Sequence, residues 1–464
     1  MENGKKSAKG IILILGIVVV VAIIYGFVAA YRNINNSSND NDVAVTTSNT
    51  ENVTKVTNTE NNNNSNTTNS KNLNITNGGS YNLSGSYESV TINTEKDVTL
   101  NLNGAEITCA NGPAINVISA DTVTIVLSGT NKITSNTTED LNGAIYSKAD
   151  LVFSGDGNLE VKSNYDGIVS KDTLVIKNGT YTINSVDDGI RGKDSVEISA
   201  GTFTINAGGD GIKSTNYEEE GLGYINITGG TYDITAYNDG IQAETNLTIK
   251  DGNFTINTTD TSSTDSAKGL KAGTLLTLDG GKYNINAVDD GIHSNGNIII
   301  NNGEFNITSK DDGVHADGLI EINGGTFTIN AAEGIEATYI KINDGSINIT
   351  ASDDGINAGN KSSSYSATIE INGGDITIAI GQGDTDGIDS NGNLYINGGT
   401  INITGNSPFD YDGIAEHNGG TIIVNGTHTD TITNQMMGGG MRGGMQNGGM
   451  PNEGMSMGGM PGRR

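Results

Sequence analysis

The sequence predicts an all-β protein built as a parallel β-helix, and three observations lead to that prediction. An acidic residue followed by Gly and an aliphatic residue recurs at a base spacing of 21 to 22 residues, as in "DDGI" and "DDGV". Each unit also holds a run such as "INGGTFTIN", in which apolar residues alternate with Thr and Asn around a glycine. This alternation indicates half-buried strands, and the glycine indicates the turn between them. Units this short bury their apolar faces only by stacking, with strands about 4.8 Å apart.

The composition agrees with thin strands and many turns. The 464 residues include 66 Gly but only 4 Pro and no Trp, which does not fit a chain packed around bulky helices. The formal net charge of -29 disfavours contact with nucleic acid, because binding to a polyanion depends on cations that displace counterions. Cys109 is the only cysteine, so an intrachain disulfide is excluded.

The first expected segment, residues 1–32, is a cytoplasmic stub and a transmembrane signal anchor. Lys5, Lys6 and Lys9 precede an uncharged apolar run at residues 11–30. Twenty residues at about 1.5 Å each span about 30 Å, enough to cross the hydrocarbon core, and the lysines favour an N-terminus inside. We expect a single-pass protein of the cell membrane with an extracellular C-terminal domain. A signal peptide cut after Ala30 is the alternative, and both interpretations export the chain.

Three more segments are expected after the anchor. Residues 33–72 are rich in Asn, Ser and Thr and predict a disordered stalk. Residues 73–433 hold the repeats and predict the β-helix domain. Residues 434–464 are rich in Gly and Met and predict a second disordered segment, for which Cu(I) binding by thioethers is the alternative interpretation.

Stacking converts the repeat into columns of residues, and one column is aromatic. It lies two places after the glycine of the alternating run and comprises Tyr181, Phe203, Tyr232, Phe254, Tyr283, Phe305 and Phe327, followed by Ile347, Ile376 and Ile401. Each ring shares a strand face with the Ile two residues later, so we expect an interior stack and not a sugar platform. Candidate exposed platforms are tyrosines in turns or insertions, namely Tyr165, Tyr217, Tyr237, Tyr365 and Tyr411.

A second column is acidic and lies directly before the motif glycine. In "SKDDGVHADGLIEINGGTFTIN", Asp311 and Asp312 precede Gly313, which is expected to set the turn. In-register stacking places such carboxylates about one strand spacing apart, where like charges repel. Turn capping explains one aspartate per coil. Pairs repeated in neighbouring coils favour bound Ca²⁺, which accepts six to eight oxygens. The predicted calcium ligands are Asp187, Asp188, Asp289, Asp290, Asp311, Asp312, Asp353 and Asp354, with the four at 289, 290, 311 and 312 the strongest set.

A third column lies two places after the motif glycine and is polar. It comprises Arg191, Lys213, Gln242, Lys271, His293, His315, Glu336, Asn357 and Asp389. His293 and His315 lie one coil apart and could share a metal. No third nitrogen ligand is evident, so a polar surface column is the preferred interpretation.

The "DDGI" and "INGGTFTIN" units make the region from Leu73 to Thr433 resemble a family of bacterial and archaeal surface proteins known as carbohydrate-binding domain proteins. The resemblance implies a right-handed β-helix like that of pectate lyases. It also implies binding of cellulose and acidic plant polysaccharide with calcium. The repeats by themselves indicate only an acidic rod.

The favoured function is therefore a cell-surface protein that binds plant-type or cell-wall polysaccharide, such as cellulose or a polygalacturonate-like polymer, with calcium. An acidic rod holds an anionic polymer only through bridging cations, whereas a neutral glucan docks on polar strands and exposed tyrosines without them. An adhesin or structural rod without enzymatic activity is one alternative. The other is a calcium-dependent pectate-type lyase with Arg191 as base, although acidic neighbours raise a cation's pKa and oppose that role.

Overall fold

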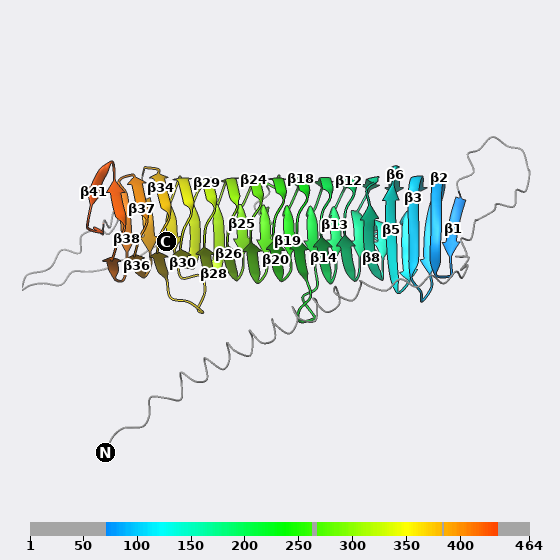
Figure 1. Ribbon diagram of the computed structural model, residues 1–464, viewed down its shortest axis with the longest axis horizontal. Coiled ribbons are helices and arrows are strands. Elements are labelled where there is room, and N and C mark those ends of the chain that lie inside the picture. The colour runs from blue at the N-terminus through cyan, green and yellow to red at the C-terminus, as the bar shows by residue number, and fades with distance from the viewer. Residues whose placement is uncertain (1–70, 262–266, 383–384, 435–464) are drawn as a thin grey trace, which may run out of the picture. The chain divides into compact units, whose positions relative to one another are not determined.

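The structure is a computed structural model that describes residues 71–261, 267–382 and 385–434 (Figure 1). All of them belong to the second of two compact units of the chain, Thr54–Arg464. They form 41 strands in one continuous sheet. None of these residues belongs to a helix long and apolar enough to cross a membrane. The predicted anchor (1–32), nearly all of the predicted stalk (33–72) and of the Gly/Met-rich tail (434–464) lie outside the described residues. The first strand begins at Lys71, two residues before the predicted start of the solenoid.

Each coil contributes one strand to each of three faces, which we name A, B and C in chain order. The solenoid opens with β1 (Lys71–Ile75) and with the two longest strands, β2 (Gly79–Asn93) and β3 (Val98–Cys109). Face A consists of β4 (Ile115–Ser119), β7 (Gly143–Ser147), β10 (Asp166–Ser170), β13 (Ile190–Gly192), β16 (Ile212–Ser214), β19 (Ile241–Ala243), β22 (Leu270–Ala272), β25 (Ile292–Ser294), β32 (Ile356–Ala358), β35 (Asp386–Ser390) and β38 (Ser407–Tyr411). Face B consists of β5 (Thr122–Ser128), β8 (Asp150–Gly155), β11 (Thr173–Ile176), β14 (Ser195–Ile198), β17 (Tyr224–Ile227), β20 (Asn246–Ile249), β23 (Leu275–Leu278), β26 (Asn297–Ile300), β33 (Thr368–Ile371), β36 (Asn393–Ile396) and β39 (Ala415–His417). Two strands, β28 (Val314–Ile322) and β30 (Ile335–Ile342), continue from face A into face B.

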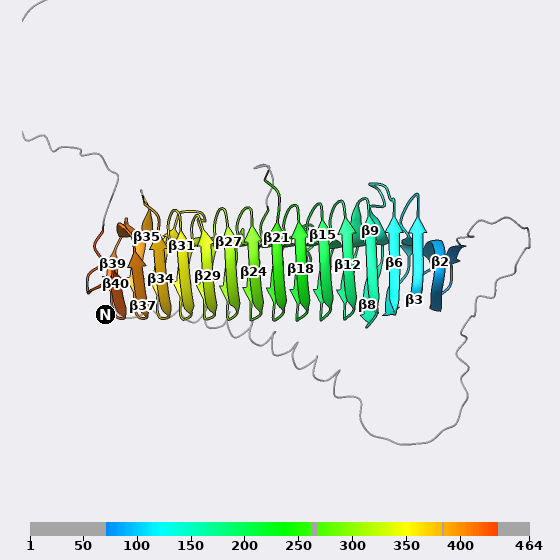
Figure 2. The same ribbon diagram turned by 90° about the horizontal axis from the view of Figure 1, so that it is seen from above.

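Face C, which Figure 2 presents to the viewer, is the most regular of the three. It consists of β6 (Thr130–Ser135), β9 (Asn158–Ser163), β12 (Thr180–Ser185), β15 (Thr202–Ala207), β18 (Thr231–Ala236), β21 (Asn253–Thr258), β24 (Lys282–Ala287), β27 (Glu304–Ser309), β29 (Thr326–Ala331), β31 (Ser346–Ala351), β34 (Asp375–Ile380), β37 (Thr400–Thr404) and β40 (Thr421–Val424). Strand β41 (Thr427–Thr429) closes the described solenoid as a hairpin with β40.

Every strand pairing between successive coils is parallel within the described ranges, and β40–β41 is the antiparallel exception. The register is continuous apart from local shifts between β1 and β2, β2 and β3, β2 and β4, and β28 and β30. Phe305 pairs with Phe327, and His293 pairs with His315, one coil apart in each case. The prediction of an all-β stack of parallel coils is therefore confirmed. Its right-handed sense stays a prediction.

The aromatic column lies inside the solenoid, as predicted. From Tyr181 to Phe327 the successive ring centroids are 4.5 to 5.0 Å apart and the ring planes lie within 11° of each other. Alternation along each strand turns the rings inward together with the neighbouring isoleucines. The hydroxyl of Tyr232 donates to the backbone oxygen of Gly229 at 2.9 Å, so the buried phenol keeps a partner.

Glycines at the corners of the coils are required for two different reasons, a positive φ or the close approach of a neighbouring coil. Gly303, in the alternating run, has a φ of +144°, a conformation that glycine adopts without strain. Gly313, in the acidic motif, has no such φ. A Cβ on it would lie 2.3 Å from Cγ2 of Ile329 and 2.6 Å from the carbonyl oxygen of Gly334. Gly313 lies at a bend directly before β28, as expected, and glycine is required there by the close approach of two coils.

A ladder of side-chain amides runs along the corner between faces B and C. Each asparagine donates from Nδ2 to the side-chain oxygen one coil earlier, at 2.7 to 3.0 Å. The ladder starts at the carboxylate of Asp279 and continues through Asn301, Asn323, Asn343, Asn372, Asn397 and Asn418. It ties the coils together on the outside as the aromatic column does on the inside.

Two insertions interrupt the repeat between faces A and B. Residues 215–223 join β16 to β17, and residues 359–367 join β32 to β33. Both leave the same edge of the solenoid, the lower one in Figure 1. Each insertion carries a tyrosine of the predicted platform set, Tyr217 in the first and Tyr365 in the second.

Candidate functional site

The acidic column stands at the start of face A and is buried. The carboxylates of Asp166, Asp188, Asp210 and Asp290 belong to residues that are at most 3% exposed. Each Oδ1 accepts a hydrogen bond from the backbone N–H of the equivalent residue in the next coil, for example from Asp188 to Asp166 at 3.1 Å and from Asp210 to Asp188 at 2.9 Å. The aspartates therefore link successive coils, which the turn-capping interpretation did not include.

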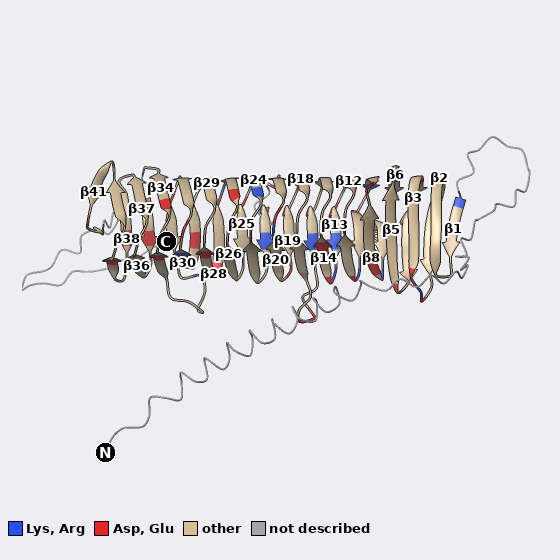
Figure 3. Cartoon of the chain, viewed as in Figure 1, with Lys and Arg blue, Asp and Glu red and all other residues tan. Residues whose placement is uncertain are grey.

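The second oxygen of these carboxylates faces a cation of the chain itself. Arg191 lies 2.6 Å from Oδ2 of Asp166 and 3.6 Å from Oδ2 of Asp188. Lys213 lies 2.5 Å from Oδ2 of Asp210. The same pattern continues with Lys271 on Asp239, Lys268 on Asp289 and Asp290, His293 on Asp290 and His315 on Asp312. The column predicted to be a polar surface is thus the counter-charge of the acidic column, and Figure 3 shows its basic residues gathered in the middle of face A.

Burial raises the pKa of two of these carboxyl groups in spite of the nearby cations, and a third behaves differently. Loss of solvent raises the pKa of Asp166 to about 7, although Arg191 opposes the rise. The same cause raises the pKa of Asp188 to about 6, against Lys213. At Asp290, hydrogen bonds and charges from His293 and Lys268 outweigh burial and hold the pKa below its usual value.

The predicted calcium ligands separate into an inner and an outer row. Asp188, Asp290 and Asp312 are buried, and Asp354 is half-buried. Asp187, Asp311 and Asp353 are exposed, and Asp289 is half-buried. Carboxylate oxygens of Asp289, Asp290 and Asp311 lie within 4.8 Å of one another, as do those of Asp166, Asp187 and Asp188. The structure brings together three members of the strongest predicted set, while Asp312 turns toward His315, and ion pairs with Lys268 hold Asp289 and Asp290.

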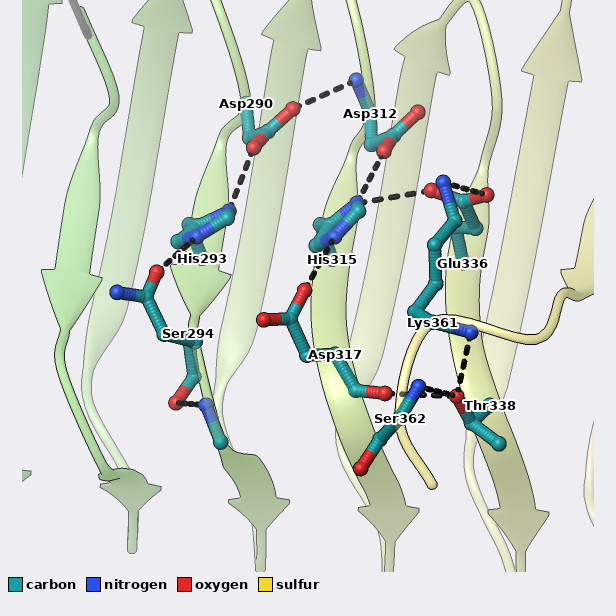
Figure 4. A network of polar contacts seen from close by, with 12 residues as sticks. Asp290, His293, Ser294, Asp312, His315, Asp317, Glu336, Thr338, Lys361 and Ser362 are labelled. Carbon is teal, nitrogen blue, oxygen red and sulfur yellow. Dashed lines mark hydrogen bonds and ion pairs between the residues drawn. The ribbon is translucent and has the colours of Figure 1, made fainter. Parts of the chain in front are cut away.

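The two histidines of the column form a stacked pair (Figure 4). Their ring centroids are 4.9 Å apart and their planes differ by 15°. Nδ1 of His293 lies 2.7 Å from Oδ2 of Asp290, and Nε2 lies 2.8 Å from the amide oxygen of Asn295. His315 differs, because its Nδ1 lies close to two carboxylates, those of Asp312 and Glu336. Burial lowers the pKa of His315, but these hydrogen bonds outweigh it and raise the pKa to about 10.

Beyond His315 the column loses its cations and becomes oxygen-rich. Glu336, Asn357, Asp389 and Asp410 follow one another in register from coil to coil. Burial, with repulsion from neighbouring aspartates, raises the pKa of Asp389 to about 7. Oδ1 of Asn357 and Oδ1 of Asp410 are buried and have no hydrogen-bond partner among the described residues. Buried oxygens without donors are the groups that a hard cation satisfies.

Face B carries two tyrosine–glutamate pairs, one beside each insertion. The hydroxyl of Tyr224 donates to Oε1 of Glu197 at 2.8 Å. The hydroxyl of Tyr339 donates to Oε2 of Glu370 at 2.5 Å. The ring of Tyr365, from the insertion 359–367, lies parallel to that of Tyr339 with centroids 6.2 Å apart.

The rest of the second pair's surroundings is polar. Lys341 forms an ion pair with Glu321 at 3.0 Å, and Asn372 donates to Oε1 of Glu370 at 2.9 Å. Lys341, Glu370 and Tyr395 follow one another in register on the outward side of face B. Hydrogen bonds from Tyr339 and Asn372 lower the pKa of Glu370, so this carboxylate is ionised at neutral pH.

The predicted platform tyrosines differ in exposure. Tyr217 is 77% exposed and Tyr237 is 43% exposed, as expected of residues in an insertion and a turn. Tyr165, Tyr365 and Tyr411 are half-buried. Sequence reasoning missed Tyr224 and Tyr339, which belong to regular strands. Their partners Glu197 and Glu370 lie in neighbouring coils and carry no local motif.

Face C offers a shallower candidate surface. A groove of about 400 Å³ lies over β21, β24, β27 and β29 and is lined on its polar side by Asn253, Thr255, Asn284, Asn306, Thr326 and Thr328. Lys282 and Glu304 form an ion pair across it at 2.7 Å. The groove lies on polar strands, and docking of a neutral glucan on such strands stays a prediction.

Comparison with known proteins places the chain in a family. A solved polysaccharide lyase-like protein from C. thermocellum, determined as a gadolinium derivative, is similar to this chain at 33% identity, with 41% of this chain and 83% of that chain covered and a TM-score of 0.39. A search of curated proteins finds no match. A family model matches residues 69–313, 296–337 and 309–444. Because these matches extend over most of the sequence, the chain belongs to the family described as carbohydrate-binding domain-containing proteins.

Proposed function

We propose that the protein binds polysaccharide through face B, at the two tyrosine–glutamate pairs beside the insertions. Membership of the carbohydrate-binding family supports the class of ligand. The observation that carries the location is the pair Tyr339 and Tyr365, whose parallel rings lie next to the ionised Glu370. Tyrosine presents an apolar ring face and a polar tip, and the apolar face of a sugar ring packs on such a surface while carboxylate, amine and amide groups bond its hydroxyls.

The two pairs have a fixed separation. Tyr224 and Tyr339 occupy the same position of the face B strand, and the intervening coils place Asn246, Leu275, Asn297 and Leu319 there. Five coil steps at about 4.8 Å give about 24 Å between them. A long polymer that spans this distance engages both pairs, and the second contact then forms at high effective concentration.

The proposal also includes a Ca²⁺ ion bound at the oxygen-rich end of the column on face A. In the middle of face A, cations of the chain already neutralise Asp166, Asp188, Asp210 and Asp290. Asn357, Asp389 and Asp410 supply oxygens only, two of them without a donor. Their donor set fits a hard cation. Bound there, Ca²⁺ supplies the positive charge through which an anionic polymer such as polygalacturonate is held.

The lyase alternative is not favoured by the position of Arg191. Its guanidinium lies 2.6 Å from the fully buried carboxylate of Asp166, and it is 17% exposed. A general base must reach the substrate proton and must release its own proton first. Arg191 is instead a structural counter-charge.

The test is binding of the full chain, purified in detergent, to insoluble cellulose and to polygalacturonate coupled covalently to beads, both measured by sedimentation. We expect Tyr365→Ala to weaken binding to both polymers roughly two- to tenfold, the value of one aromatic contact. Tyr237→Ala, a tyrosine on another corner, is the matched control and should bind as the parent does. EDTA should abolish binding of polygalacturonate and leave most of the cellulose binding. Equal binding by Tyr365→Ala and the parent, or an equal effect of EDTA on both polymers, would contradict the proposal.

The location of the protein at the cell surface is part of the same proposal. The apolar segment at residues 11–30 anchors the chain, and the solenoid faces outward. A glycan array separates this function from an adhesin or rod without sugar specificity. Binding to no glycan, together with binding to another cell-surface protein, would favour the rod.

A further inference from the structure

One coil reverses the charge order of face A. At the third-column position, Arg191, Lys213, Lys271, His293 and His315 supply positive or ionisable nitrogen, and Glu336 occupies the same position one coil later. Glu336 is 5% exposed and points back toward His315 (Figure 4). The reversal creates a cluster in which two buried carboxylates lie next to the same nitrogen of one imidazole.

The geometry of this cluster leaves one hydrogen for two acceptors. Nδ1 of His315 lies 2.6 Å from Oδ2 of Asp312 and 2.9 Å from Oε2 of Glu336. An imidazole nitrogen carries a single proton, so at most one of the two carboxylates receives a well-aligned hydrogen bond. The three atoms lie within 4.8 Å of one another, close enough for one ion to replace that proton. Nitrogen with two carboxylate oxygens is a donor set for a divalent transition metal, since Ca²⁺ takes oxygen.

Neighbouring charged groups orient two of the proposed metal ligands, His315 and Glu336. Nε2 of His315 faces Oδ1 of the Asp317 carboxylate at 3.5 Å, and this negative charge favours the tautomer that carries its proton on Nε2. Oε1 of Glu336 accepts from Lys361 at 2.8 Å, which leaves Oε2 directed at His315. Ligand atoms of His293, Asp290 and His315 also lie within 4.8 Å of one another, but the Nε2 of His293 bonds to the amide of Asn295 and no carboxylate among the described residues faces it.

We infer that Asp312, His315 and Glu336 form a binding site for a divalent transition metal of the Zn²⁺ type. The ion binds Nδ1 of the neutral imidazole and one oxygen of each carboxylate, and the Nδ1 proton leaves to solvent. The fourth tetrahedral position is open to water. This site is separate from the oxygen-only site assigned to calcium and does not depend on the polysaccharide proposal.

The site also touches the insertion that carries Tyr365. Oγ1 of Thr338 accepts from the backbone N–H of Lys361 at 3.0 Å and of Ser362 at 2.8 Å, which fixes the start of the insertion on β30. Lys361 then reaches Glu336. A metal that holds Glu336 therefore steadies the base of the loop on which the sugar platform stands.

The test is calorimetric titration of Zn²⁺ into the full chain in detergent, with Ca²⁺ present in excess to occupy oxygen sites. We expect saturable binding and a raised unfolding midpoint, both lost in His315→Lys. That variant keeps the ion pair, because lysine is what other coils use at this position, and circular dichroism confirms its fold. His293→Ala is the matched control and should retain binding, whereas loss of binding in it would place the metal between Asp290, His293 and His315 and overturn the inference. Asp317→Asn, which changes a positioning residue, should weaken binding roughly 10- to 100-fold.

Two further readings complete the test. Co²⁺ in place of Zn²⁺ should give visible absorption bands in the parent and none in His315→Lys. No binding by the parent overturns the inference and leaves Asp312, His315 and Glu336 as a structural ion cluster. Equal binding by the parent and His315→Lys also overturns it, since the metal would then bind elsewhere in the chain.

Discussion

Replacing Arg191 with alanine separates the structural role of the charged column from a catalytic one. Arg191 is the cation that lies 2.6 Å from the buried carboxylate of Asp166. The pKa of Asp166 is about 7 in the folded protein and 3.8 in the reference state. The folded chain thus holds this proton more tightly than the unfolded chain does, so the carboxyl's contribution to stability falls as the pH rises from about 4 to 7.

Above pH 7, Arg191 limits the loss of stability that comes from Asp166. The size of this effect gives the expected cost of Arg191→Ala. Without Arg191, the buried carboxyl of Asp166 stays protonated to higher pH. The folded variant then lacks the stabilisation that the folded parent gains when Asp166 ionises above pH 7. One unit of pH above the parent's pKa is worth about 1.4 kcal/mol. Beyond a constant packing loss, Arg191→Ala should therefore cost almost nothing more at pH 6 and about 1.4 kcal/mol more at pH 8.

The assay is urea denaturation of parent and variant at both pH values, with polygalacturonate cleavage followed by ultraviolet absorbance in parallel. In the Asp166→Asn background, Arg191→Ala should show a smaller difference between its losses at pH 6 and pH 8, and the part that remains comes from Asp188. A loss in the single variant that does not change with pH would refute the ion-pair reasoning. Cleavage by the parent that disappears in Arg191→Ala would refute the structural assignment.

Three more predictions test the column and the core. Asp389→Asn should raise the unfolding midpoint of calcium-free protein at pH 8 but not at pH 4. The reason is that the raised pKa of Asp389 makes its ionisation destabilise the fold as the pH rises from about 4 to 7. The same variant should lose the stabilisation by added Ca²⁺. In the aromatic column, Tyr232→Phe should cost about 1 kcal/mol for one hydrogen bond, whereas Phe254→Ala should cost about 3–5 kcal/mol for a cavity; similar losses by denaturation would argue against the interior stack. Gly313→Ala should destabilise by about 1–3 kcal/mol or more, because its methyl group meets Ile329 and Gly334; an unchanged midpoint would mean that the coils can separate locally.

Much of the fold could be predicted because stacking makes sequence period equal to structural period. Alternation placed Phe327 and Ile329 inside, and the repeat placed Phe305 one coil away. The role of Gly313 could not be predicted, since close approach involves the carbonyl of Gly334, whose position depends on how the coils nest. A sequence period gives the order of neighbours but not their separation at a corner.

The acidic and polar columns of face A could be predicted from the sequence, but the ion pairs between them could not. Asp188 and Arg191 stand three residues apart across a corner, and alternation gives no angle for that corner. The repulsion within the acidic column was anticipated, but its neutralisation by the adjacent column was not. Tyr339 and Glu370 were missed for another reason, because the insertion at 359–367 shifts the numbering between two positions that are adjacent in space.

All the side-chain amides of the asparagine ladder have the same orientation, and the ladder repeats once per coil. Every amide points its donor toward the previous coil, so the dipoles add along one edge and end on the carboxylate of Asp279. A coil gained or lost as a whole preserves this chain of donors, whereas a partial coil breaks it. Because coils stack at the strand spacing, adding or removing whole coils would change the distance between the two tyrosine–glutamate pairs in steps of about 4.8 Å.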